Sequence, residues 1–141
     1  MVFTHEQAIE ADGICRNTLV SHLGIRFSVD EKGRFCATMP VASHTHQPMG
    51  LLHGGATAAL AETLGSMASS FLIDRSTQGV VGIEVNANHL KGVRTGNVKA
   101  TGILVHKGRT THVWDIRVTN DAGDLCAICR LTNLVVRSER P

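Results

Sequence analysis

Glu62 is the most unusual side chain of this sequence, a carboxylate within the small-residue run Ala-Thr-Ala-Ala-Leu-Ala-Glu-Thr-Leu-Gly-Ser. Carboxylates are seldom buried without a partner, and one in such a run is suited to act as a general base or nucleophile. Ser66 and Ser69 follow at i+4 and i+7, so on a helix the three side chains share a small polar face. The alternative is a surface glutamate on a solvated stripe, but its neighbours are then more often lysine and glutamine.

Two glycines, Gly54 and Gly55, precede this run and would begin the same helix. The first N–H groups of a helix have no intrahelical partner, and the helix dipole is positive at that end. Glycine also lets a substrate carbonyl approach those N–H groups closely, as an oxyanion hole requires. The alternative is that the pair only turns the chain into the helix.

The elements that position these residues follow from the spacing of apolar side chains. Three-and-four spacing predicts a short helix from His5 to about Ser21 and a long, largely enclosed helix from Gly54 to about Asp74. Runs of β-branched residues between turn signals predict the strands 24–29, 34–39, 80–90, 98–106, 110–119 and 125–136. The first two form a hairpin and the last three an antiparallel meander. This is an α+β fold, with one antiparallel sheet curled around a central helix.

Length and composition place bounds on the function. A chain of 141 residues with 43% hydrophobic and 18% charged residues is expected to fold as one domain over residues 1–141. A net charge of +2 does not indicate a nucleic-acid partner. The most apolar stretch, 56–73, contains Glu62 and is not expected to span a membrane. The N-terminus lacks the pattern of a secretory signal, so the expected location is cytoplasmic.

Metal and redox chemistry are not expected either. His44, His46 and His53 have no carboxylate or cysteine beside them at zinc-site spacing. Cys126 and Cys129 form a C-x-x-C pair, but residues three apart on a strand point to opposite faces. We therefore expect no metal and no cofactor.

The segment Gln-Pro-x-Gly-x-Leu-His-Gly-Gly-Ala, followed by Leu-Ala-Glu-Thr-Leu-Gly-Ser and Val-Val-Gly-Ile-Glu-Val-Asn-Ala-Asn-His, resembles the hotdog-fold thioesterase family. Within the family it is most similar to the 1,4-dihydroxy-2-naphthoyl-CoA hydrolases, the enterobactin proofreading thioesterases and the phenylacetate-pathway thioesterases. The resemblance runs from about Leu19 to Val136. It implies a hotdog sheet of about five to six strands around one long helix, and hydrolysis of an acyl-CoA thioester whose CoA is part of the substrate.

The resemblance also assigns roles to five residues. The Gly54 N–H would polarise the thioester carbonyl, with Gln47 and His53 helping to hold it. Glu62 would attack that carbonyl or activate water, and Ser66 would position the water. Both routes for Glu62 remain open.

Helix geometry adds a condition, because Gly54 and Glu62 lie ~12 Å apart along one helix whereas reacting groups meet within ~3–3.5 Å. If both act on one thioester, they come from two subunits with antiparallel helices, in a homodimer with two equivalent sites. The family resemblance implies the same arrangement, with dimers pairing into a homotetramer.

Coenzyme A phosphates require cationic groups near the site. Five residues on strand ends and turns are candidates: His89, Lys91, Arg94, Lys107 and Arg109. Each could equally be a solvated turn charge. Positions that would set the acyl preference are Met49, Leu51, Met67 and Phe71. Two other functions stay open, a hotdog-fold hydratase or dehydratase and a non-catalytic acyl-CoA binding module.

Overall fold

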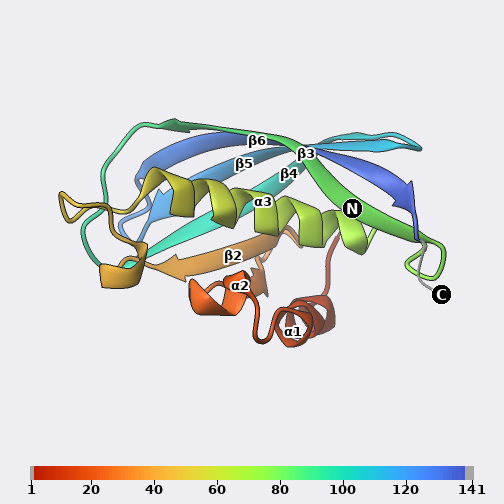
Figure 1. Cartoon of the computed structure of the whole chain (residues 1–141), viewed down its shortest axis with the longest axis horizontal. Helices are drawn as coiled ribbons and strands as arrows, with labels where there is room; N and C mark the ends of the chain where they lie inside the picture. Colours follow the sequence, from red (N-terminus) through yellow and green to blue (C-terminus); the bar gives the residue numbers. More distant parts are fainter. Residues whose placement is uncertain (1, 139–141) are drawn as a thin grey trace.

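The computed structural model describes residues 2–138, and Figure 1 shows one long helix lying across a curved sheet. Two short helices, α1 and α2, lie beside β1 and β2 at the lower edge of that view. The helices are α1 (His5–Ile14), α2 (Leu19–His22) and α3 (Gly54–Ser70). The strands are β1 (Arg26–Val29), β2 (Phe35–Pro40), β3 (Gln78–His89), β4 (Asn97–Lys107), β5 (Thr111–Asn120) and β6 (Leu125–Arg137). The α+β prediction is confirmed, with the sheet wrapped around α3 as in the hotdog fold.

The six strands form one antiparallel sheet in the order β1-β2-β4-β5-β6-β3. The predicted hairpin and the predicted meander are both present. β3 forms one edge of the sheet and pairs along one side only, with β6. Its apolar residues Val81 and Ile83 are 45% and 57% exposed. A long edge strand with exposed apolar side chains is a surface suited to pairing with another strand.

α3 packs closely on the inner face of the sheet. Leu60 and Leu64 are fully buried, and the sheet contributes Trp114 and Leu131 to the same core. Gly65 permits the close approach, because a Cβ there would lie 2.5 Å from Leu131 Cδ2 and 3.3 Å from Trp114 Cγ. The backbone of the helix therefore lies almost directly on these two side chains.

Two predicted helix boundaries are wrong. α3 ends at Ser70 rather than near Asp74, because the Asp74 carboxylate accepts hydrogen bonds from Ser76 and Thr77 and stabilises a turn instead. These bonds also lower the pKa of Asp74. The N-terminal segment is two helices, because Asn17 adopts a positive φ of 59° between them.

Within residues 2–138, no helix is both long and apolar enough to cross a lipid bilayer.

Candidate functional site

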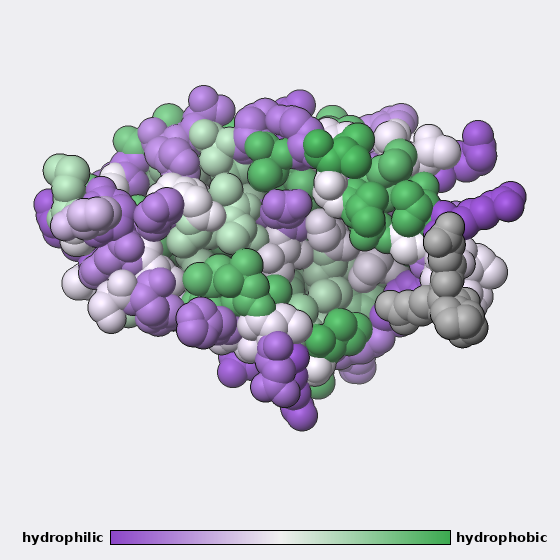
Figure 2. Space-filling model, in the orientation of Figure 1, coloured by the Kyte–Doolittle hydropathy of each residue, from purple (hydrophilic) through white to green (hydrophobic). Residues whose placement is uncertain are grey.

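One face of α3 opens into a cavity of about 920 Å³, which we call the carboxylate hollow. Glu62, Ser66 and Met67 line it, and the other large apolar side chains around it are Ile14, Leu19, Val20, Ile73 and Val80. Figure 2 shows this side of the molecule as a pale strip flanked by green apolar patches. Glu62 is half-buried, and no side chain of residues 2–138 forms a hydrogen bond or ion pair with its carboxylate. The carboxylate is thus available to a water or a substrate.

Gly82 on β3 provides the space that the Glu62 carboxylate occupies. A Cβ at position 82 would collide with Glu62 Oε1. The pairing of β3 with β6 shifts register between Gly82 and Glu84, so the strand bulges at the same place. Gly82 had no sequence prediction, because a glycine in a strand does not reveal which side chain approaches it.

A second cavity, of about 300 Å³, lies at the N-terminal end of α3, and we call it the glycine hollow. Gln47, Gly54, His89 and Lys91 line it. The Gly54 N–H has no hydrogen-bond partner among the described residues, whereas the next three N–H groups of α3 do. An unpaired N–H at the positive end of a helix is suited to donate to a carbonyl oxygen.

His53 is the N-cap of α3, and its ring fixes the start of the helix. Nδ1 accepts a hydrogen bond of 2.8 Å from the Gly55 N–H. That bond requires a lone pair on Nδ1, so in the neutral ring the proton is on Nε2. The capped second N–H leaves the first, that of Gly54, as the free donor.

Gln47 and His89 complete the glycine hollow. The Gln47 side-chain oxygen accepts from the Met49 N–H, which leaves its NH₂ group to donate elsewhere. The His89 ring lies against Gly54, since a Cβ on that glycine would stand 2.9 Å from His89 Nε2. Gly54 therefore shares the glycine hollow with two polar side chains that lie close to it in the fold.

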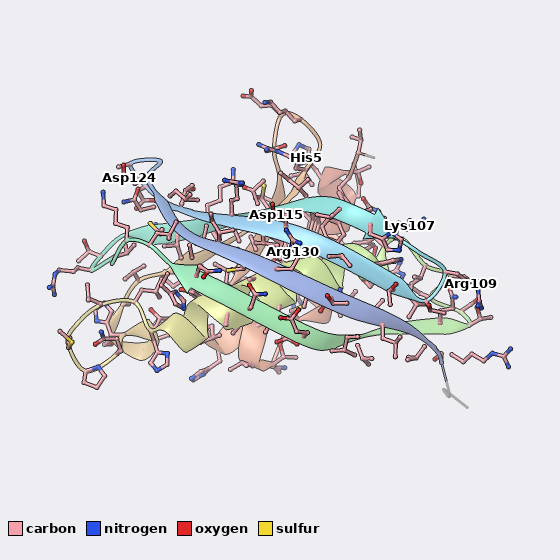
Figure 3. All side chains as sticks on the ribbon, turned by 90° about the horizontal axis from the view of Figure 1, so that it is seen from above. His5, Lys107, Arg109, Asp115, Asp124 and Arg130 are labelled. Atoms are coloured by element: carbon pink, nitrogen blue, oxygen red, sulfur yellow. The ribbon has the colours of Figure 1, made fainter. Side chains whose placement is uncertain are left out.

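The basic residues predicted to hold phosphates fall into two groups. Lys91 forms an ion pair of 2.5 Å with Asp124, which raises the pKa of the exposed lysine, and Arg94 donates to the Met49 carbonyl. Lys107 and Arg109 lie on the β4–β5 hairpin, at the opposite end of the sheet from Asp124 (Figure 3). The structure therefore does not bring the five candidates together.

Three positions differ from their expected places. Ser69 is fully buried and accepts hydrogen bonds from Trp114 on β5 and Asn133 on β6, because the sheet covers the last turns of α3. Phe71 packs on Phe35 with ring centroids 5.8 Å apart, and Met49 is 75% exposed on its loop. Met67 does line the carboxylate hollow, and Leu51 lines the glycine hollow.

Two groups of residues at the site had no sequence prediction. Ile14, Leu19 and Val20 come from the N-terminal segment, which is distant in sequence, yet they line the same carboxylate hollow as the residues of α3. Asn133 could have been found from strand alternation. It lies two residues after Leu131 and therefore on the same, inward face of the strand, where a polar residue is unusual.

Within residues 2–138, no three histidine, cysteine or acidic side chains are grouped as metal ligands would be. All four cysteines are free and buried, and burial, followed by the nearby Asp115 charge, raises the pKa of Cys129 to about 11. These thiols are therefore protonated packing residues.

Comparison with known proteins adds an independent finding. The thioesterase superfamily matches residues 49–127, a range that contains both glycines and Glu62. The proofreading thioesterase EntH of Klebsiella pneumoniae is 49% identical over 120 residues, which cover 85% of this chain and 87% of that protein. A crystal structure of a mutant thioesterase from Pseudomonas aeruginosa superposes with a TM-score of 0.90 at 50% identity, covering 93% of this chain and 94% of the other.

A thioesterase from Haemophilus influenzae has a TM-score of 0.88 at 41% identity, and covers 99% of this chain and 95% of its own. These likenesses span the wrapped sheet, α3 and the loop before it. The chain is an enzyme of the thioesterase superfamily with the hotdog fold.

Proposed function

We propose that this protein hydrolyses an acyl-coenzyme A thioester to the free acid and coenzyme A. One observation carries the proposal. α3 presents a half-buried carboxylate beside a hydroxyl in a hollow with apolar walls, and the same helix begins with an N–H that has no partner among the described residues. These are the carboxylate and the oxyanion donor that acyl transfer to water requires.

In the proposed reaction the Gly54 N–H donates to the thioester carbonyl, with Gln47 and His53 holding the same oxygen. Along one route Glu62 takes a proton from water as the water oxygen bonds to the acyl carbon, and the departing thiolate then receives that proton. Along the other route the carboxylate itself bonds to the acyl carbon and expels the thiolate, which is protonated by solvent. Water then cleaves the resulting anhydride and restores Glu62. Both routes yield one acid and one thiol.

The site is proposed to be shared between two subunits. Glu62 and Gly54 line separate hollows of one chain, in agreement with their ~12 Å separation along the helix. An antiparallel partner helix would bring the Gly54 of one chain to the Glu62 of the other. β3 supports this pairing, because it is an edge strand with exposed apolar residues and it runs next to Glu62.

The proposed acyl group is aromatic, such as the 1,4-dihydroxy-2-naphthoyl group. The apolar side chains around Glu62 favour a hydrophobic acyl group over a charged one. His89 and Lys91 line the glycine hollow and Arg94 lies on the following turn, so these three are the proposed phosphate ligands. Coenzyme A leaves as a product, and no further cofactor is required.

Release of free thiol from a panel of aromatic and aliphatic acyl-CoA substrates tests the proposal. A hydratase or dehydratase would change the acyl chain without releasing thiol, and a binding module would bind acyl-CoA without turnover. Thiol release by the unmodified protein therefore separates the three functions. Its absence across a panel that the protein binds would overturn the proposal.

Glu62→Gln tests the carboxylate directly. The amide has nearly the same shape but can neither accept a proton nor attack the carbonyl, so kcat should fall ~10²-fold or more at saturating substrate. Glu31→Gln, on the exposed β1–β2 turn, is the matched control and should retain kcat. A Glu62→Gln enzyme with wild-type kcat and an unchanged melting temperature would remove Glu62 from the mechanism.

A further inference from the structure

A buried polar network lies directly beneath the carboxylate hollow. Asn133 on β6 is fully buried, and its NH₂ group donates to the Gly65 carbonyl at 3.1 Å and to Ser69 Oγ at 3.0 Å. Its side-chain oxygen accepts from the Ser66 hydroxyl at 3.2 Å. Trp114 Nε1 donates to Ser69 Oγ at 2.8 Å and completes the network. The network thus connects the sheet to the hydroxyl beside Glu62.

The direction of each hydrogen bond in this network is determined by chemistry. The Gly65 carbonyl can only accept, so the NH₂ end of Asn133 must face it and the oxygen must face Ser66. An amide oxygen carries no proton, and Ser66 must therefore donate to it. The hydroxyl proton of Ser66 is therefore used in the bond to Asn133, and only lone pairs of the Ser66 oxygen face the carboxylate hollow.

This direction determines what Ser66 can do at the site. A water between Ser66 and Glu62 would donate one O–H to the Ser66 oxygen and the other to the carboxylate one helical turn earlier. With both hydrogens held by acceptors, a lone pair of the water is left for the acyl carbon. Ser66 itself cannot pass its proton to Glu62 while Asn133 holds it, so it is not activated as a competing nucleophile.

We propose that Asn133 is a positioning residue for hydrolysis, which holds Ser66 as a hydrogen-bond acceptor toward the attacking water. This inference rests on the proposed thioesterase activity and concerns its water alone. In the base route the oriented water bonds to the acyl carbon while Glu62 takes its proton, and the thiolate leaves with that proton. In the anhydride route the same water attacks the acyl-Glu62 anhydride.

Asn133→Val is the principal test. Valine is close in size and favours strands, but it offers Ser66 no acceptor, so the hydroxyl is free to donate into the hollow. We expect kcat to fall ~10-fold while KM stays within about twofold, since a water-positioning defect acts on the chemical step rather than on acyl-CoA binding. Asn133→Thr, whose hydroxyl ends one bond nearer the backbone than the amide oxygen, is the second variant if the valine protein is insoluble.

Two controls separate positioning from packing. Ser69→Ala removes another member of the network without touching Ser66, and should lower the melting temperature while retaining kcat. Asn133→Asp loses the NH₂ donors but still accepts from Ser66, so it should recover most of the kcat that valine loses despite its lower stability. A purely structural role for Asn133 predicts instead that kcat follows stability across all these variants.

A double-mutant cycle completes the experiment. If Asn133 acts through Ser66, the Asn133→Val change should cost almost nothing in a Ser66→Ala background. Three results would each overturn the inference: an undiminished cost in that background, wild-type kcat in both the Val and Thr variants, or a loss of kcat in Ser69→Ala and Asn133→Asp as large as that in Asn133→Val. The thioesterase proposal is tested separately by thiol release from the unmodified protein, so the two can fail independently.

Discussion

His112 on β5 is a histidine with 1% exposure, and it points to the inner face of the sheet beside Asn133 on β6. Its Nδ1 is buried and has no hydrogen-bond partner among the described residues. Burial lowers the pKa of this ring, and the electrostatic effect of the neighbouring Lys107 and His106 lowers it further. The folded protein therefore holds His112 neutral at pH values where an exposed histidine takes up a proton.

This depressed pKa predicts a loss of stability in acid. Below about pH 6.5 His112 is protonated in the unfolded chain but not in the folded chain. The contribution of neutral His112 to the free energy of unfolding is therefore fully present above that pH and is lost as pH falls. His112→Leu removes this contribution and leaves every other histidine unchanged. Between about pH 8 and pH 5 the melting temperature of the variant should fall less than that of the wild type. If the melting temperatures of the variant and the wild type fall equally with pH, His112 has the same pKa in the folded and unfolded chains, and the prediction is wrong.

The polar groups of the site that the sequence predicts are those whose immediate neighbours in the chain make them unusual. Glu62 was recognisable among alanines, and Gly54 by its place at a helix start. Helical spacing predicts that Ser69 shares the face of Glu62 and Ser66, and spacing alone cannot show that the sheet covers the last turns of α3. Asn133 was missed because its partners, Ser66 and Gly65, are far from it in sequence and only the register of β6 brings them together.

The position of the Glu62 carboxylate depends on the contact between α3 and β3. Glu62 projects from the helix across the edge strand, and Gly82 is where the strand leaves room for it. Any side chain at position 82 must displace either the carboxylate or the strand. The bulge beside Gly82 fixes the position of this gap along β3.

Gly82→Ala should accordingly lower kcat ~10-fold or more, because a displacement of ~1 Å in a reacting group can cost ~10²-fold. Gly13→Ala in α1 is the matched control, since a Cβ there meets nothing within 4 Å. In a Glu62→Ala background the Gly82 change should have little further effect. Equal kcat in the Gly82→Ala and wild-type enzymes would show that the carboxylate does not need its present position.

The elements themselves were largely predictable from sequence. The six strands and α3 came from periodicity and turn residues, and every predicted strand lies within two residues of its observed bounds. Apolar spacing predicts too late an end for α3 because it continues through Phe71 and Leu72, whereas the hydrogen bonds of the Asp74 side chain end the helix. The order of strands was not predictable beyond the meander, because β3 and β6 pair across an intervening hairpin.

Each chain carries both kinds of half-site, and in the proposed pair its two hollows belong to two different sites. The Glu62 half and the Gly54 half lie apart on the same helix. A single chain would then be inactive, and activity would require a pair. This can be tested with two variants that are each defective in a different half.

His53→Ala and Glu62→Ala homodimers should each be nearly inactive, because every site lacks one half. A mixed dimer contains one site with both halves intact and one site with both lesions. Random pairing makes roughly half of the dimers mixed, so roughly a quarter of all sites should be competent. Thiol release by dimers purified through two different affinity tags should therefore clearly exceed that of either parent.

Association of the two tagged chains is the necessary control, measured by sedimentation or native mass. A doubly tagged dimer that is as inactive as both parents would contradict the shared site. Substantial activity in either parent would instead show that the residue changed in it, His53 or Glu62, is not required for hydrolysis.

Helix α3 has 17 residues and extends for ~25 Å as one rigid rod. In the proposed pair, each rod would carry the acid of one site near its middle and the hydrogen-bond donor of the other site at its tip. A sliding movement that tightened one site would then have to shift a part of the other. Because both sites contain parts of the same two helices, a substrate or a mutation that moves a helix at one site would also change the geometry of the other site.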